Sequence, residues 1–362
     1  MRAVLLCSKN DLGHHVLRSL DSVGAKVFLI HDKRTAASVG LSRRRQGILL
    51  ASPRLTDEAP EKLLRLINDF HAREPVDVVI GSDVVAMKLL HGIRADLAPA
   101  VFPFPDLETL RVLDNKWHFY NLCLEIGIDA PQTRFFATKN DIDPHEISRD
   151  FRYPVVVKPV SRHGAIGFEM IADRGGLETR ILRNPAYDHP DLLIQEYVPG
   201  IDLGLSVFAR DGRVEYWTTF NCGKNWGTEF CERPELLALG KRLIAATRFS
   251  GVANFDARLD AVSGAIRMLE CNPRFFARTT ATRLCGLDFV RAGLAAIGLV
   301  QLDEPCLCRG EFYPASQLLS IDGWKRLLAG RWPVRPMLRN LGEIISDPLP
   351  IAARNLGLDA AA

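Results

Sequence analysis

The sequence predicts a mixed fold, α/β and α+β, in which a doubly wound parallel-sheet lobe is followed by antiparallel hairpins. Three observations predict it. Residues 1–100 alternate short apolar strands with amphipathic helices, a pattern typical of a parallel sheet. Residues 203–220 form two strand-like segments around Arg210-Asp211-Gly212-Arg213, which indicates a hairpin turn. Residues 252–274 alternate apolar and polar side chains and contain a second turn at Val262-Ser263-Gly264.

The composition is that of a globular protein with more than one core. At 362 residues the chain can hold two or three compact domains. Its hydrophobic fraction of 47% and charged fraction of 25% are ordinary for such proteins. A net charge of +3 is too small to indicate nucleic-acid binding, which usually needs a basic stripe. We therefore expect no nucleic-acid partner.

The cysteines and the first residues indicate a cytoplasmic location. Eight cysteines are scattered without a CxxC pair, which is typical of reduced thiols. The start of the chain lacks the cleavage pattern of a signal peptide, and no apolar run is long enough to span a bilayer. We expect a cytoplasmic protein without a transmembrane segment.

The N-terminal α/β lobe is expected over residues 1–105. Its predicted strands are Ala3–Cys7, Lys26–His31, Gln46–Leu50 and Val76–Ile80, and its predicted helices are Leu12–Val23 and Ala59–Ala72. Ligands of a parallel sheet bind at the carboxyl ends of its strands, where Ser8, Asn10, Ser82 and Asp83 lie. Because no GxGxxG follows the first strand, a nicotinamide dinucleotide is a poor candidate.

One dense charge run, Arg43-Arg44-Arg45, falls in this lobe. Most runs of this kind are solvated faces. The alternative is an anion site facing the ligand cleft, because guanidinium groups bind carboxylates and phosphates. Both interpretations stay open at this point.

The middle of the chain contains two lysines in unusual settings. Asp106 is a helix cap after the linker prolines 103 and 105, and a second helix is predicted at Lys116–Ile126. Further on, the β-branched strand Val155-Val156-Val157 delivers Lys158 beside Pro159, where its charge needs a partner. The loop from Ser161 to Gly167 follows, and successive backbone amides in such a loop can hold phosphate oxygens.

The hairpin at 252–274 carries the densest set of candidate ligands. Its two strands bring Asp256 beside Glu270 and Asn272, with Arg274 just beyond. Two carboxylates and an amide oxygen in one small volume suit Mg²⁺, which keeps several waters and is completed by nucleotide phosphates. The alternative is a solvated hairpin with a polar outer face.

Five pieces of the chain together resemble the ATP-grasp superfamily. They occur in family order across about 106–280: Lys116, VVVKP, the glycine loop, Gln195-Glu196-Tyr197-Val198-Pro199-Gly200, and Asp256 with Glu270-x-Asn272-Pro273-Arg274. The resemblance implies an ATP-grasp domain over 106–300, with a small lobe at about 125–195 and a large lobe at about 196–300. It also implies ATP and Mg²⁺ (or Mn²⁺) as cofactors.

The resemblance further implies a role for each matching residue. ATP is expected to contact Lys116, Lys158, Ser161, Gly164 and Gly167 at its phosphates, Gln195, Glu196 and Val198 at its adenine, and Asp202 at its ribose. The metal ligands are expected to be Asp256, Glu270 and Asn272. The catalytic candidates are Arg274, Arg258 and, in the glycine-rich loop 221–229, Lys224.

The implied activity is an ATP-dependent ligase that joins a carboxylate to an amine or similar nucleophile. It would proceed through an acyl phosphate and release ADP and phosphate. The expected partners are a small-molecule carboxylate and amine, and a homodimer is left open. Two alternatives remain: a non-catalytic ATP-binding module acting as a sensor or scaffold, and a ligase that modifies a protein.

The C-terminal part, 301–362, is unlike the rest. It is basic and dotted with aromatic residues, among them Trp324, Lys325, Trp332, Arg335 and Arg339. We interpret it as a helical appendage that packs on the body. Docking to an anionic membrane surface or to a protein partner is the alternative.

Overall fold

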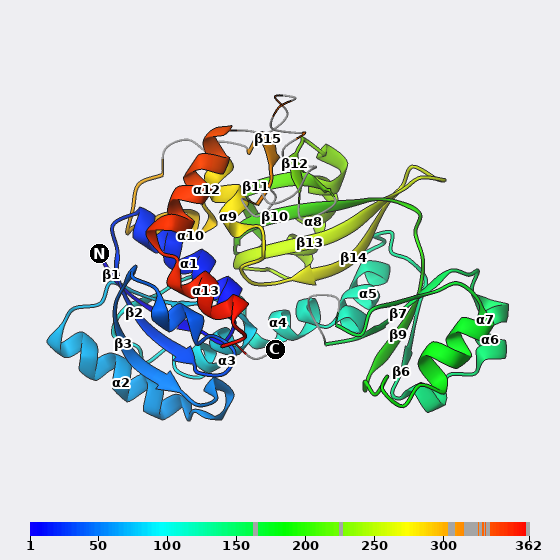
Figure 1. The fold of residues 1–362 in the computed structure, drawn as a ribbon, viewed down its shortest axis with the longest axis horizontal. Coiled ribbons are helices and arrows are strands. Elements are labelled where there is room, and N and C mark those ends of the chain that lie inside the picture. The colour runs from blue at the N-terminus through cyan, green and yellow to red at the C-terminus, as the bar shows by residue number, and fades with distance from the viewer. Residues whose placement is uncertain are drawn as a thin grey trace.

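The structure, a computed structural model, contains three β-sheets that follow one another along the chain (Figure 1). It describes residues 1–161, 166–223, 227–302, 308–314, 325, 328, 330 and 334–359. Glycine 164 and Lys224, both predicted to act in the site, lie outside the described residues. In the described part of the chain, no helix combines the length and apolar character needed to span a membrane.

The first sheet is parallel and has the strand order β3-β2-β1-β4-β5. Its strands are β1 Arg2–Cys7, β2 Lys26–Asp32, β3 Arg45–Ser52, β4 Val78–Gly81 and β5 Ala100–Val101. Helix α1 (Asn10–Ser22) covers one face, while α2 (Pro60–Arg73) and α3 (Val84–His91) cover the other. Because helices cover both faces, β1 and β4 are almost wholly apolar and buried, as expected for a parallel sheet.

Two helices, α4 (Leu107–Asp114) and α5 (Lys116–Glu125), lead to a small antiparallel sheet of order β6-β9-β7-β8. The strands are β6 Thr133–Phe136, β7 Val155–Pro159, β8 Glu169–Ile171 and β9 Leu192–Glu196. Its core includes side chains of α6 (Pro144–Asp150) and α7 (Arg174–Leu177). This sheet lies at the end of the molecule farthest from the N-terminal sheet (Figure 1).

The third sheet is antiparallel, with the order β14-β13-β10-β11-β12-β15. Its strands are β10 Gly200–Arg210, β11 Arg213–Cys222, β12 Thr228–Phe230, β13 Gly251–Asp260, β14 Ile266–Asn272 and β15 Gly310–Phe312. Helix α8 (Pro234–Ala246) packs on one face together with α5. On the other face, α9 (Thr279–Cys285) and α10 (Phe289–Ala296) share a core with α1 and β1.

One close contact shows how tightly the N-terminal lobe and this sheet are joined. Phe102 lies against Gly293 of α10, where an added Cβ would come within 2.0 Å of the ring atom Cζ. A larger residue at 293 would have to displace the ring, which is itself buried. The two lobes therefore share one continuous core.

The C-terminal helices α12 (Val334–Ser346) and α13 (Leu349–Asn355) run back across α1 (Figure 1). Glu343 of α12 accepts from Arg283 of α9, and Arg354 of α13 donates to Asp11 at 2.5 Å. Asp347, between the two helices, accepts from Ser42 Oγ at 2.5 Å. The appendage packs on the body, in agreement with the first of the two interpretations.

The structure also answers the question about the arginine run. Arg44 forms ion pairs with Asp21 of α1 and with Asp347 of the appendage. The backbone amide of Arg43 donates to Asp347 at 2.9 Å. Arg44 and the Arg43 amide thus anchor the C-terminal helices to the N-terminal lobe. The Arg43 side chain is exposed, as a solvated face predicts, whereas the Arg44 side chain is held in ion pairs.

Candidate active site

The hairpin of β13 and β14 places two carboxylates directly opposite each other. Asp256 pairs with Glu270 in the antiparallel register, and Asn254 pairs with Asn272. The amide Nδ2 of Asn272 donates to Asp256 Oδ2 at 3.2 Å, and Nδ2 of Asn254 donates to Oδ1 at 2.9 Å. Cross-strand neighbours on one face lie close enough for side-chain contact. The amides hold the Asp256 carboxylate in place beside Glu270.

The two carboxyl groups differ in pKa although they are neighbours. Burial, together with the charge of Glu270, raises the pKa of Asp256 to about 7. Burial acts in the same direction on Glu270, but Lys116, Lys158 and Arg274 outweigh it and hold its pKa below the usual value. Glu270 is therefore the carboxyl group that the nearby cations keep ionised. Asp256 would need a further cation beside it to hold its negative charge.

Two lysines from different elements surround Glu270. Lys116, at the start of α5, has Nζ 3.6 Å from Glu270 Oε2 and donates to the Val160 carbonyl at 3.2 Å. Lys158, the residue before the end of β7, is buried, and burial lowers its pKa to about 8 despite the attraction of Glu270. Asn115 fixes the start of α5, because its side chain accepts from two backbone amides of the first turn.

The two arginines predicted as catalytic lie in different places. Arg274 is buried and donates from Nη2 to Asn272 Oδ1 at 2.8 Å, so it lies beside the predicted metal ligands. Arg258 instead donates to the Gly200 carbonyl at 2.7 Å and lies 3.3 Å from Asp202. The reason is the pairing of β13 with β10, which puts Arg258 directly opposite Asp202.

The end of β9 supplies the residues expected at the adenine. Gln195 is buried and donates from Nε2 to Thr133 Oγ1 at 2.9 Å. The Glu196 carboxylate accepts from Arg267 at 3.0 Å, and Val198 is buried. These contacts fix the chain where it passes from the small sheet into the large one.

Ser161 and Gly167 flank the part of the glycine loop that lies outside the described residues. Gly167 has φ +73°, and a Cβ there would lie 2.7 Å from Pro159 Cγ. Its carbonyl accepts from the Tyr187 hydroxyl at 2.6 Å. A residue with a side chain would be strained at this position, so the loop needs glycine here.

The residues of the hairpin fit a hard divalent cation completed by phosphate oxygens. In the described part of the chain, no group of three or more His, Cys, Asp or Glu side chains could hold a metal. Asp256 and Glu270 with the Asn272 amide offer few protein ligands, as Mg²⁺ sites with bound phosphates do. Lys116 and Lys158 beside them suit the negative charge of a nucleotide.

Comparisons with known proteins point in the same direction. A D-aspartate ligase of Enterococcus faecium (strain Aus0004) is 23% identical over 218 residues, covering 53% of this chain and 51% of that protein. The chain thus spans about half the length of this curated relative. None of the protein-family models matches the chain.

Solved structures give the fold. The L-amino acid ligase from Bacillus licheniformis has a TM-score of 0.59 at 16% identity, over 81% of this chain and 73% of that one. The biotin carboxylase domain of the Hydrogenobacter thermophilus 2-oxoglutarate carboxylase, crystallised as a dimer with MgADP, ADP and bicarbonate, scores 0.63 at 13% identity. It covers 85% of this chain and 73% of that one. The chain has the ATP-grasp fold.

In the ATP-grasp fold of this chain, the small and large antiparallel sheets meet at Pro199, between β9 and β10. Lys158 comes from the small sheet, while Asp256, Glu270 and Asn272 come from the large one. Lys116 reaches Glu270 from the helix that precedes both sheets. The residues that the motifs predicted therefore converge from three separate segments of the chain.

Two polar residues near this group, Asp114 and Arg278, were not among the predicted site residues. Burial raises the pKa of Asp114, although Arg274 and Lys116 pull it down. Asp114 directly precedes Asn115 and Lys116, and this adjacency was the one signal that could have marked it. Arg278 donates from Nε to Thr228 Oγ1 at 3.0 Å, and its positive charge acts to lower the pKa of Asp256. Its position directly after the β13–β14 hairpin indicates from the sequence a residue that could face the substrate.

Proposed function

We propose that this protein is an ATP-dependent ligase that joins a carboxylate to an amine and releases ADP and phosphate. The observation that carries the proposal is the pairing of Asp256 with Glu270 across the hairpin, with Lys116 Nζ 3.6 Å from the second carboxylate. Two carboxylates and two lysines in one place suit a metal-bound polyphosphate better than a purely structural role, because burying charges is costly.

In the proposed reaction, a carboxylate oxygen of the substrate attacks the γ-phosphorus of ATP, and the bond to the ADP oxygen breaks. The amine then attacks the acyl carbon, phosphate leaves with the bonding electrons, and the amine loses a proton. The products are an amide, ADP and phosphate. The protein acts mainly by holding the reactants and neutralising charge.

The residues of the chain divide this task between them. Lys116 and Lys158 would bind phosphate oxygens, while Arg274 orients the Asn272 amide through its 2.8 Å hydrogen bond. Asp256, Glu270 and Asn272 would hold Mg²⁺ or Mn²⁺, which supplies charge neutralisation at the phosphates. Gln195, Glu196 and Val198 would line the adenine pocket, and Asp202 would bind the ribose.

The names of the similar proteins support the same class of reaction. A D-aspartate ligase and an L-amino acid ligase both join amino acids to other groups by name, and a third neighbour was crystallised with MgADP. Because the chain spans about half of the curated relative, its own substrates are part of the proposal.

The proposal is tested by ADP release from a pool of carboxylates and amines, followed by an isotope experiment. Oxygen-18 in the carboxylate of the active acid should appear in the released phosphate. Product formation with no label in phosphate would contradict acyl-phosphate chemistry, and pyrophosphate release would indicate adenylation instead. Absence of ADP release with every acid, despite ATP binding, would favour a non-catalytic module.

A further inference from the structure

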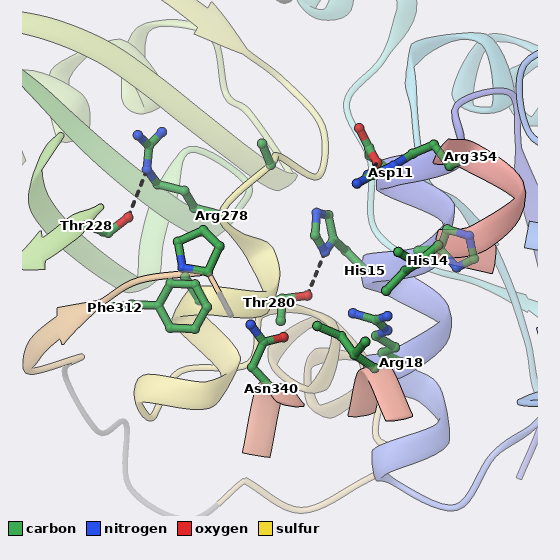
Figure 2. Close-up of a pocket in the computed structure, with 15 residues that line it drawn as sticks. Asp11, His14, His15, Arg18, Thr228, Arg278, Thr280, Phe312, Asn340 and Arg354 are labelled. Atoms are coloured by element: carbon green, nitrogen blue, oxygen red, sulfur yellow. Dashed lines mark hydrogen bonds and ion pairs between the residues drawn. The ribbon is translucent and has the colours of Figure 1, made fainter. Parts of the chain in front are cut away.

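A cavity of about 460 Å³ lies between helices of the N-terminal lobe, the large sheet and the C-terminal appendage (Figure 2). We call it the Arg18 cavity. Its polar lining includes Arg18 and His15 of α1, Arg278 and Thr280 near the start of α9, and Asn340 of α12. Its apolar lining includes Ala281, Phe312, Ile344 and Ile351.

Arg18 is a buried cation that lacks a partner in the described structure. Its side chain is 9% exposed, and no hydrogen bond or ion pair joins it to another described residue. The carboxylate of Glu343 nearby already accepts two hydrogen bonds of 2.7 Å from Arg283. Asp347 likewise accepts from Ser42 and from the Arg43 amide. The neighbouring acids are therefore engaged elsewhere.

An unpaired buried guanidinium is costly, because its charge has lost water and gained no anion. Arg18 lines the cavity, so an anion bound there would provide the missing partner. A guanidinium binds a carboxylate through two parallel hydrogen bonds, which gives direction as well as charge pairing. The cavity therefore needs an anionic ligand at this end.

Two more polar groups face the same space. Asn340 is 6% exposed, and no side-chain hydrogen bond joins its amide to another described residue. Nδ1 of His15 is 2.6 Å from Thr280 Oγ1, which places the imidazole at the wall of the cavity. Figure 2 shows the side chains of Arg18, Thr280 and Asn340 gathered around one volume. Buried polar groups normally have partners, and a polar ligand would supply partners to Arg18 and Asn340.

The remaining walls suit an organic ligand. Phe312, Ile344 and Ile351 are carbon surfaces, which a bare phosphate or sulfate would leave uncovered. Small-molecule sites usually combine such apolar walls with a few placed polar groups. A carbon chain that ends in a carboxylate matches both parts of the cavity.

The other end of the cavity lies toward the candidate active site. Arg278 lines the cavity, and its charge acts on the metal-ligand candidate Asp256. In Figure 2 the Arg278 and Arg18 side chains lie on different sides of Thr280. A substrate carboxylate that reacts with ATP would be near Arg278, which leaves Arg18 for a second anionic group.

We propose that the Arg18 cavity binds the carboxylate substrate of the ligase, and that this substrate is a small acid with two carboxylates. Arg18 and Asn340 bind the carboxylate that does not react. This inference rests on the proposed function for the identity of the reacting end. It also gives the C-terminal appendage a role, because α12 supplies Asn340 and Ile344.

The test is thermal unfolding of the full chain without ATP, with succinate, glutarate and aspartate as probes. Matched monocarboxylates (butyrate, alanine) and inorganic sulfate and phosphate form the comparison arms. The dicarboxylates should raise the melting temperature of the wild type, and the comparison arms should not. Equal protection by monocarboxylates or inorganic anions would overturn the proposal.

The variant Arg18→Met should melt at the wild-type temperature or higher without ligand, because it removes an unpaired buried charge. It should bind the dicarboxylates at least tenfold more weakly. Arg18→Lys, which keeps the charge but cannot form two parallel hydrogen bonds to a carboxylate, should show a smaller loss of dicarboxylate affinity. Arg111→Met, at an exposed ion pair, is the control that should change neither property. A lower melting temperature or unchanged binding in Arg18→Met would overturn the proposal.

A separate arm distinguishes this inference from the proposed function. Lys158→Ala should keep Arg18-dependent dicarboxylate binding while binding ATP at least tenfold more weakly. Dicarboxylate binding without ADP release from any amine would refute the ligase and leave the cavity assignment standing. Carboxylate-dependent ADP release that is equal in the wild type and Arg18→Met would refute the cavity assignment and leave the ligase standing.

Discussion

Lys116 Nζ lies 3.6 Å from Glu270 Oε2, so the first residue of α5 contacts the second strand of the β13–β14 hairpin. The same ammonium group donates to the Val160 carbonyl, just after Lys158 of the small sheet. This one side chain therefore joins the two antiparallel sheets at the place where the phosphates of a nucleotide would bind. Changes at this point should affect nucleotide chemistry more than folding.

Glu270→Gln should keep the fold and lower the rate of ADP release on the order of 100-fold, because a metal would lose a charged ligand. The measurement is ADP release over a magnesium titration, with circular dichroism to check the fold. Glu215→Gln, on the same sheet and paired with Arg210 at the surface, is the control. A Glu270→Gln enzyme running at the wild-type rate would show that the metal assignment is wrong.

Lys158→Ala should give a folded protein that binds ATP at least tenfold more weakly, since a cation beside the phosphates is lost. Lys158 is buried next to the charge of Glu270, so its role is local to the site. Titration calorimetry with ATP and magnesium measures the change. Lys241→Ala, on the exposed face of α8, serves as the control. Unchanged affinity in Lys158→Ala would refute this role.

Stability should fall in acid because His15 is held neutral. Burial, with help from Arg18 and Arg283, lowers the pKa of His15 from 6.5 to about 3. Between these values the unfolded chain binds a proton that the folded protein does not, so stability is full above pH 6.5 and is lost as the pH falls. At pH 5 this one group costs about 2 kcal/mol.

Urea unfolding from pH 8 to pH 5 measures this dependence. His15→Asn should show a shallower loss of stability with falling pH than the wild type, whatever its stability at pH 8. His145→Asn, at an exposed position, should keep the wild-type slope. Identical slopes in His15→Asn and the wild type would mean that His15 is not held neutral by the fold.

Asp347→Asn should loosen the C-terminal helices and lower the free energy of unfolding by about 2 kcal/mol. Asp347 is 1% exposed and binds Ser42, the Arg43 amide and Arg44. Asparagine has no negative charge, so it would leave the positive charge of Arg44 with less compensation. Amide hydrogen exchange in α12 and α13 should speed up. Asp57→Asn, whose carboxylate is exposed, is the control. Unaltered exchange in these helices would contradict the anchoring role.

Much of the fold could be predicted from local patterns. The apolar strands and amphipathic helices of the N-terminal lobe, and the hairpins after residue 200, have periods that depend on neighbouring residues alone. The predicted and observed helix ends differ by one or two residues. Helix α1, for example, starts at Asn10, whereas the sequence predicts a start at Leu12. Short elements such as β5 and α9 lacked enough residues to show a period, and they were not predicted.

The motif residues Lys116, Lys158, Asp256 and Glu270 could be named because each belongs to a contiguous pattern of strand, turn and proline. Their mutual distances depended on the tertiary structure, and so did the position of Arg258, which strand pairing placed opposite Asp202. Strand pairing is a contact between distant segments, and no local period specifies it in full.

The Arg18 cavity was decided by tertiary structure alone. Arg18 in α1, Thr280 in α9 and Asn340 in α12 are far apart in the sequence, and neither Arg18 nor Asn340 belongs to a motif that marks a site. A helical period can place Arg18 on one face of α1, but it cannot say that α12 covers that face. Burial makes an unpaired charge costly, and burial exists only once the chain has packed.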